Sequence, residues 1–248
     1  MAKRSTTGPI GVLGEHADKP TLRRAASSRD RRIVDGDPAT VYAADPTLVV
    51  ALDPPALRAA LATGPETPVY PVGIDDAFGI TPSALDGIVE ALLTGEYTIE
   101  HRMVLRVGVG EESVPALFDA TVMTDEPARI SEYGVDIGSQ DSVDTIRADG
   151  VVVASPIGSS CYAAAAGGPT ITPGTRTVGV VPISPFTVDR PTWVVDPPVA
   201  LTVCREEGAV SLYADGAQVS PVGKGETVTI DAQGQAAIAT VSAPDEKT

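Results

Sequence analysis

The sequence is poor in the residues that build metal centres and disulfides. It has two histidines and two cysteines, and Cys161 and Cys204 lie far apart without forming a CxxC pair. So few cysteines and histidines argue against a disulfide framework and against a zinc site. We therefore predict no metal site made from the chain's own side chains, and a reducing, cytoplasmic location.

Long apolar runs and basic clusters are missing as well. No apolar stretch approaches the roughly 20 residues that span a bilayer, and residues 1–7 lack the apolar segment of a signal peptide. The 18 Lys and Arg residues face 33 Asp and Glu, which gives a net charge of −15. Because so acidic a surface repels phosphate backbones and anionic lipids, we predict neither nucleic acid nor a membrane as a partner.

Lysine is especially scarce among the basic residues. The only lysines are Lys3, Lys19, Lys224 and Lys247. Two interpretations stay open, namely ordinary solubility and adaptation to a high-salt cytoplasm in which ions screen the repulsion between carboxylates. We favour the second, because the shortage of lysine is as marked as the excess of acid.

The first third of the chain alternates strands with helices. Behind a tail at residues 1–8, we predict a small Rossmann-like α/β domain over residues 9–95, with one short helix between Ile10 and Leu48. The predicted strands are Ile10–Leu13, Thr47–Leu52 and Pro68–Ile74, and the predicted helices are Thr21–Ser28, Ala56–Ala62 and Pro82–Leu93.

From residue 96 onward the apolar pattern alternates with the period of strands. We predict a β-rich domain over residues 96–240, built as a β-sandwich, and a tail at 241–248. The fold class is therefore α/β followed by β. The predicted strands are Thr98–Val109, Ala116–Met123, Val143–Ile146, Val151–Ala154, Val199–Val203, Val210–Tyr213 and Thr227–Ile230.

One loop of the second domain carries residues suited to binding. After the strand Val151–Ala154, Gly158, Ser159 and Ser160 precede a helix of small residues and offer backbone and hydroxyl donors for an anion or a ribose. Tyr162 could stack on a base, and Asp149 could accept hydrogen bonds from a ligand. From the residues alone, a capped helix without a ligand explains the pattern as well.

This stretch, DGVVVASPIGSSCYAAAAGGP from Asp149 to Pro169, closely resembles the signature of the NAD kinase family. Further segments agree in the same order. The segment Ile99–Leu105 is similar to the family's EERMML strand, Val181–Phe186 with Arg190 and Pro191 to its TPI-S/C-PH…RP segment, and Asp215 with Gly216 and Gln218 to its VDGQ turn. The resemblance extends over roughly residues 45–235.

The resemblance implies an α/β domain followed by a β-sandwich, assembled as a homodimer or homotetramer. It implies transfer of phosphate from ATP or polyphosphate, with Mg²⁺, to the 2′-hydroxyl of NAD, giving NADP. It also implies that Asp149, Tyr162 and the Gly158–Ser160 loop contact the dinucleotide, and that Asp119 takes part.

The donor side departs from the family pattern. Where the family has a GGDG loop that closes on the donor phosphates, this chain has Ala51-Leu52-Asp53-Pro54-Pro55. The resemblance makes Asp53 the general base toward the ribose hydroxyl, although an Asp before prolines also simply begins a turn. Leu52 adds bulk, and Pro54 has no N–H to donate.

The acceptor side is altered too. The family's Asn-Glu pair falls on Phe118 and Asp119, and Ile157 stands where the family has Thr or Ser. We expect Cys161 to pack as a small buried side chain and His101 to be structural.

Three functions follow for comparison. The chain is an active NAD kinase, a non-catalytic NAD- or NADP-binding regulator, or a structural component of an oligomer without nucleotide. Because one fold can host many functions, only the residues of the site can distinguish these three.

Overall fold

The structure is a computed structural model, and it describes residues 8–15, 19–72, 85–126, 129–138, 144–187 and 191–241. The chain forms two compact units, residues 1–101 with 235–248 and residues 102–234. Strands β5 (Thr98–Val109) and β16 (Thr227–Thr240) contribute residues to both units. Most of both expected tails and parts of other expected segments lie outside the described residues, namely residues 73–74, 82–84, 143 and 190.

The first unit is built on a parallel sheet with the strand order β2-β1-β3-β4, and the end of β16 lies beside β4. The strands β1 and β3 are buried along their whole length, as expected for a parallel sheet covered on both faces. The strands are β1 (Ile10–Leu13), β2 (Ile33–Asp35), β3 (Leu48–Ala51) and β4 (Val69–Pro71).

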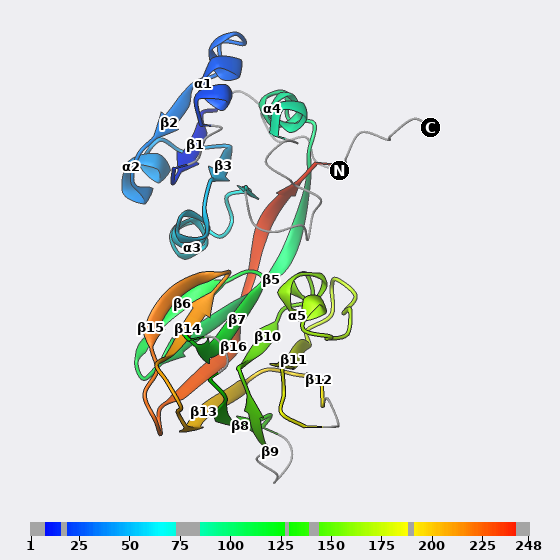
Figure 1. Cartoon of the computed structure of the whole chain (residues 1–248). Helices are drawn as coiled ribbons and strands as arrows, with labels where there is room; N and C mark the ends of the chain where they lie inside the picture. Colours follow the sequence, from blue (N-terminus) through cyan, green and yellow to red (C-terminus); the bar gives the residue numbers. More distant parts are fainter. Residues whose placement is uncertain are drawn as a thin grey trace. The chain divides into compact units, whose positions relative to one another are not determined.

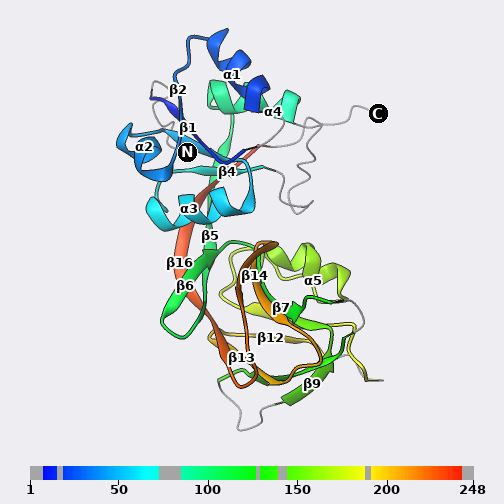
Figure 2. The same cartoon turned by 60° about the vertical axis from the view of Figure 1, so that its left-hand side comes forward.

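Helices cover both faces of this sheet. Helix α1 packs beside α4 and α2 beside α3, with the two pairs on opposite sides of the strands (Figures 1 and 2). The helices are α1 (Lys19–Ser27), α2 (Pro38–Ala43), α3 (Pro54–Thr63) and α4 (Leu85–Thr94). The expectation of one short helix between Ile10 and Leu48 is wrong, because β2 and α2 also lie there. Both are too short to produce a readable apolar period.

The second unit consists of two sheets. One has the strand order β12-β11-β10-β7-β14-β15, and the other includes β16-β13-β8-β9 and the β5–β6 hairpin. The strands not yet named are β6 (Glu112–Ala116), β7 (Asp119–Thr124), β8 (Ser131–Asp136), β9 (Asp144–Ala148), β10 (Gly150–Ala154), β11 (Val178–Ile183), β12 (Trp193–Val195), β13 (Val199–Arg205), β14 (Val210–Ala214) and β15 (Ala217–Pro221).

Strand β10 explains how the candidate loop is anchored. Val151 and Val153 point into the core between the sheets, whereas Val152 and Ala154 pack on the other face, against the short helix α5 (Tyr162–Ala165). Because both faces are covered, β10 is apolar throughout. The expected order of an α/β part and a β part is confirmed, and no helix of the described residues is long and apolar enough to cross a membrane.

Candidate functional site

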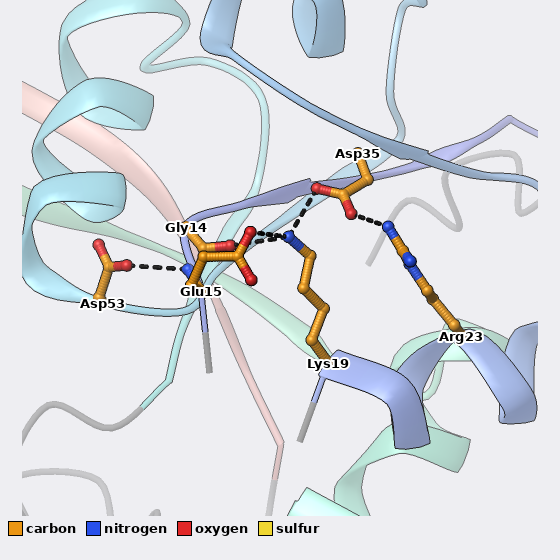
Figure 3. A network of polar contacts seen from close by, with 6 residues as sticks. All are labelled: Gly14, Glu15, Lys19, Arg23, Asp35 and Asp53. Carbon is orange, nitrogen blue, oxygen red and sulfur yellow. Dashed lines mark hydrogen bonds and ion pairs between the residues drawn. The ribbon is translucent and has the colours of Figure 1, made fainter. Parts of the chain in front are cut away.

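Asp53 lies at the carboxyl end of β3, where it caps helix α3. Its Oδ1 accepts the Ala56 N–H at 2.7 Å, and its Oδ2 accepts the Glu15 N–H at 3.0 Å (Figure 3). Glu15 belongs to the turn after β1, so the carboxylate joins two neighbouring strand ends. A Cβ on Gly14, whose φ is +84°, would lie 2.4 Å from Asp53 Oδ2. Glycine at position 14 therefore allows the turn to approach the carboxylate.

The first four residues of α3 offer no free amide to a phosphate. Pro54 and Pro55 carry no N–H, the Ala56 N–H is bonded to the Asp53 side chain, and the Leu57 N–H to the Asp53 carbonyl at 3.0 Å. The usual anion site at a helix N-terminus is thus occupied by the chain itself.

Leu52 does not obstruct this loop, contrary to the expectation from the sequence. Its side chain is buried in the core of the first unit, and its N–H donates to the Leu13 carbonyl at 3.0 Å. The prolines, and not the leucine, are the changes that remove donors.

A buried lysine lies on the other side of the turn after β1. Lys19 Nζ is 2.7 Å from Glu15 Oε1, 2.9 Å from Asp35 Oδ1 and 3.1 Å from the Gly14 carbonyl oxygen. Arg23 forms an ion pair with the same Asp35 (Figure 3). Burial by itself lowers the pKa of Lys19, but the contacts with Glu15 and Asp35 outweigh it and raise the pKa. Lys19 therefore stays charged.

The loop after β10 is fixed to the residues that precede β7. The Ser155 N–H donates to the Phe118 carbonyl at 2.8 Å, and the Ser155 hydroxyl to the Leu117 carbonyl at 2.6 Å. A Cβ on Gly158 would lie 1.9 Å from the Phe118 oxygen, so only glycine fits there. The loop and the start of β7 form one rigid piece.

The expected free donors of this loop are largely used within it. The Gly158 N–H donates to the Ser155 hydroxyl at 3.3 Å, and the Ser159 N–H to the Ser155 carbonyl at 2.9 Å. The buried Ser159 hydroxyl accepts the Ile171 N–H at 2.8 Å and donates to the Pro156 carbonyl. The expectation that Gly158 and Ser159 present donors to a ligand is thus corrected, because both amides already have partners.

The surface of the loop is formed by Ser160, the last residue of a short 3₁₀ turn (Gly158–Ser160), and by Tyr162, the first residue of α5. Ser160 is exposed, and its hydroxyl donates to the Ile157 carbonyl at 3.1 Å. The Tyr162 side chain is 41% exposed, which suits contact with a ligand. Cys161 is half-buried and not enclosed, which corrects the expectation of a buried side chain.

Asp119 and Asp215 form an acidic pair behind this loop. Asp215 accepts the N–H groups of Leu117 at 2.9 Å, Phe118 at 2.7 Å and Asp119 at 3.2 Å. Burial and, to a smaller extent, the charge of Asp215 together raise the pKa of Asp119 to about 7, although the hydrogen bond from the Thr121 hydroxyl opposes the shift. The Asp119 carboxyl therefore titrates near neutral pH.

The sequence alone predicts no role for Asp215 beyond its place in the turn that resembles the family's VDGQ turn. The sequence signal for this position is the Asp215-Gly216 pair, which is typical of a tight turn. In the structure φ is positive at both residues, +50° and +74°.

Asp149 and Asp119 lie at opposite ends of paired strands. Gly150 of β10 faces Met123, and Ala154 faces Asp119. The two acids nevertheless act on one group, since burial first, then the charges of Asp119 and Asp149, raise the pKa of Tyr162. The second unit thus brings both acids into electrostatic reach of Tyr162, whereas Asp53 belongs to the first unit.

A cavity of about 430 Å³ is lined by Arg147, Phe186 and Trp193, among others, and Arg147 lies 5.5 Å from the centre of the Phe186 ring. Among the described residues, no group of three His, Cys, Asp or Glu side chains could hold a metal ion. His101 lies in β5 with an exposed side chain.

Known proteins resemble this chain in sequence and in fold. Residues 119–241 match the family model of the ATP-NAD kinase C-terminal domain. The NAD kinase 2 of Gloeobacter violaceus is 32% identical over 212 residues, which are 78% of this chain and 66% of that protein. The chain belongs to the NAD kinase family. The family resemblance inferred from the motifs is thereby confirmed.

The NAD kinase of Symbiobacterium thermophilum is 37% identical over 149 residues, 57% of this chain and 52% of that protein. The matched part of the chain thus spans about half to two thirds of these NAD kinases.

Solved structures establish the NAD kinase fold. Yeast NADH kinase complexed with NADH superimposes with a TM-score of 0.72 at 14% identity, over 97% of this chain and 85% of that one. An NAD kinase from Archaeoglobus fulgidus in complex with ATP gives 0.67 at 20% identity, over 93% and 92%. The expected fold class is confirmed by both.

Proposed function

We propose that this chain phosphorylates NAD at the 2′-hydroxyl of its adenosine ribose, giving NADP. The terminal phosphoryl group of ATP or polyphosphate would pass to the ribose oxygen, releasing ADP or a polyphosphate one unit shorter, while the hydroxyl proton passes to Asp53. The observation that carries the proposal is the orientation of the Asp53 carboxylate by two backbone amides. Family membership supports the same reaction.

Asp53 has the properties of a positioned general base. Each carboxylate oxygen accepts one N–H bond at 2.7 or 3.0 Å, which leaves further lone pairs for the ribose hydroxyl. Phosphoryl transfer depends mainly on position and on charge stabilisation. Mg²⁺ bound to the donor phosphates would neutralise their charge, and such ions need few protein ligands.

The surface of the second unit around Ser160 and Tyr162 would bind the dinucleotide. Tyr162 offers a ring face to a base, and Ser160 and Asp149 offer polar groups for the ribose or an amide. When the buried Asp119 carboxyl carries a proton, its O–H would be a hydrogen-bond donor to the dinucleotide. Gly158 and Ser159 would act by shaping this loop, since their amides and the Ser159 hydroxyl already have partners.

A specific observation favours a second candidate, an inactive NAD- or NADP-binding regulator. The first four residues of α3 offer no free amide to donor phosphates, because Pro54 and Pro55 have none and those of Ala56 and Leu57 are bonded. Weak turnover is the intermediate case. As a setting for either function, we propose a homodimer or homotetramer in a salt-rich cytoplasm, which suits the net charge of −15.

One experiment separates these functions. The pure protein is incubated at high salt with NAD, Mg²⁺ and ATP or polyphosphate, and NADP formation is measured together with the affinity for NAD. Turnover supports the kinase, binding without turnover supports the regulator, and absence of both supports a structural component.

A further inference from the structure

The turn after β1 is held from two sides. On one side, the Glu15 N–H donates to Asp53 Oδ2 at 3.0 Å. On the other, Lys19 Nζ reaches the Gly14 carbonyl at 3.1 Å and Glu15 Oε1 at 2.7 Å (Figure 3). The Gly14–Glu15 turn therefore contacts the candidate base through Glu15 and a buried cation through both residues.

Lys19 is well suited to fix this turn. Its side chain is 11% exposed, and its three donors have three acceptors, of which Asp35 is the third. The Glu15 side chain is 87% exposed, so its contact with Lys19 is what ties it to the protein interior. Arg23 also forms an ion pair with Asp35, but the side-chain contacts to the Gly14–Glu15 turn described above come from Lys19.

The turn also has little freedom to move without consequence. Gly14 adopts a left-handed backbone, and its Cα lies so close to Asp53 that a Cβ would be 2.4 Å from Oδ2. A small displacement of Gly14 or Glu15 therefore changes the contact with the carboxylate directly. Because the reactivity of a base depends on its geometry, such a displacement alters the rate of the step it assists.

We propose that Lys19 is a positioning residue for Asp53, because it holds the Gly14–Glu15 turn so that the Glu15 amide stays on the Asp53 carboxylate. This inference rests on the proposed function, in which Asp53 is the base. Lys19 acts through the turn and does not itself contact a reacting atom.

The test compares Lys19→Met with Arg23→Met. Both variants remove a cation from Asp35, but only the first releases the turn. We expect Lys19→Met to lower kcat about tenfold, with KM for NAD changed less than about twofold. Arg23→Met should keep the wild-type kcat. In an Asp53→Asn background, Lys19→Met should cause no further loss, because the carboxylate it positions is gone.

A second measurement does not depend on turnover. Hydrogen exchange of the Glu15 N–H, followed by NMR, should be at least about tenfold faster in Lys19→Met, because the amide loses its fixed acceptor. The Leu52 N–H, bonded to the Leu13 carbonyl at 3.0 Å, is the internal control and should be unchanged. Glu15→Ala, at an exposed side chain, gives the same comparison if Lys19→Met does not fold.

The outcomes are distinct. Unchanged kcat in Lys19→Met, or an equal loss in Arg23→Met, overturns the positioning role while the kinase function stands. If the wild-type chain forms no NADP, the proposed function fails. The Glu15 exchange rate then decides, because unchanged exchange overturns the role of Lys19 and faster exchange supports it.

Discussion

Replacing Asp53 by Asn separates the two roles that the structure gives this residue. Asn is as good an N-cap as Asp, so Oδ1 can still accept the Ala56 N–H, now 2.7 Å away. The other oxygen becomes an NH₂ group, which cannot accept the Glu15 N–H and cannot take a proton from a hydroxyl. The substitution therefore keeps the cap and removes the base.

The magnitudes of the two effects differ enough to be measured apart. Losing the charge at the start of α3 costs about 0.3–1 kcal/mol, and losing the Glu15 bond about 0.5–1.5 kcal/mol. A domain with about 5 kcal/mol or more of stability therefore stays folded. Loss of a general base lowers kcat by about 10²- to 10⁴-fold, or about 3–5 kcal/mol in the barrier. The rate should fall far more than the stability.

Asp37 provides the matched control. It caps α2 as Asp53 caps α3, with the Thr40 N–H 2.8 Å from its Oδ1 and a proline next in the chain. Asp37→Asn should leave kcat within about twofold of wild type, because no reacting group depends on this cap. The assay is NADP formation at high salt, with urea unfolding in the same buffer. The base assignment fails if Asp53→Asn keeps more than about a third of the wild-type kcat, or if both variants lose activity equally.

Three further changes test other parts of the site. Asp119 has a pKa of about 7 in the folded chain against 3.8 as a free side chain. Its contribution to the free energy of unfolding is therefore complete below pH 3.8 and is lost as the pH rises through 7. Asp119→Asn should flatten this part of the pH–stability curve, and an unchanged curve contradicts the shift. Gly158→Ala places a Cβ 1.9 Å from the Phe118 oxygen; it should destabilise the chain by about 2 kcal/mol and weaken NAD binding in calorimetry, and wild-type values for both would be inconsistent with a rigid loop. Pro55→Ala adds an amide at the second position of α3; KM for ATP should fall about threefold if the donor lies at that end, and an unchanged KM places it elsewhere.

The outline of the fold could be predicted where a segment carries a strong local signal, such as the helix-forming residues of Ala56–Ala62 and the continuous apolar run of Thr47–Leu52. Ala56–Ala62 was expected as a helix and lies within α3 (Pro54–Thr63), and Thr47–Leu52 was expected as a strand and contains β3. The strand β2 and the helix α2 were missed, because three and six residues are too few to show a period. The strand β8 (Ser131–Asp136) was also missed, because only Tyr133 and Val135 in it are large and apolar, which is too few for a clear alternation.

The site was predicted less completely than the fold, because donors cannot be counted from a sequence. Gly158 and Ser159 looked available, yet their amides are bonded to Ser155, three and four residues earlier. Leu52 looked obstructive, yet its side chain points into the core. The first error comes from hydrogen bonds within the turn and the second from packing in the core, and neither can be read from the residue types. The shifted pKa of Asp119 is of the same kind, since it arises from burial and from Asp215, which lies far along the chain.

The presence of an aspartate at position 53 is therefore weak evidence for catalysis by itself. An N-cap followed by proline explains Asp53 as fully as it explains Asp37. What a cap does not require is the Glu15 amide on the second oxygen, nor a glycine at position 14 where a Cβ would clash with that oxygen. Capping is a local matter of three residues, whereas this contact joins positions 38 residues apart and depends on Lys19. The turn after β1, and not the aspartate alone, is the feature of the first unit that argues for a retained base.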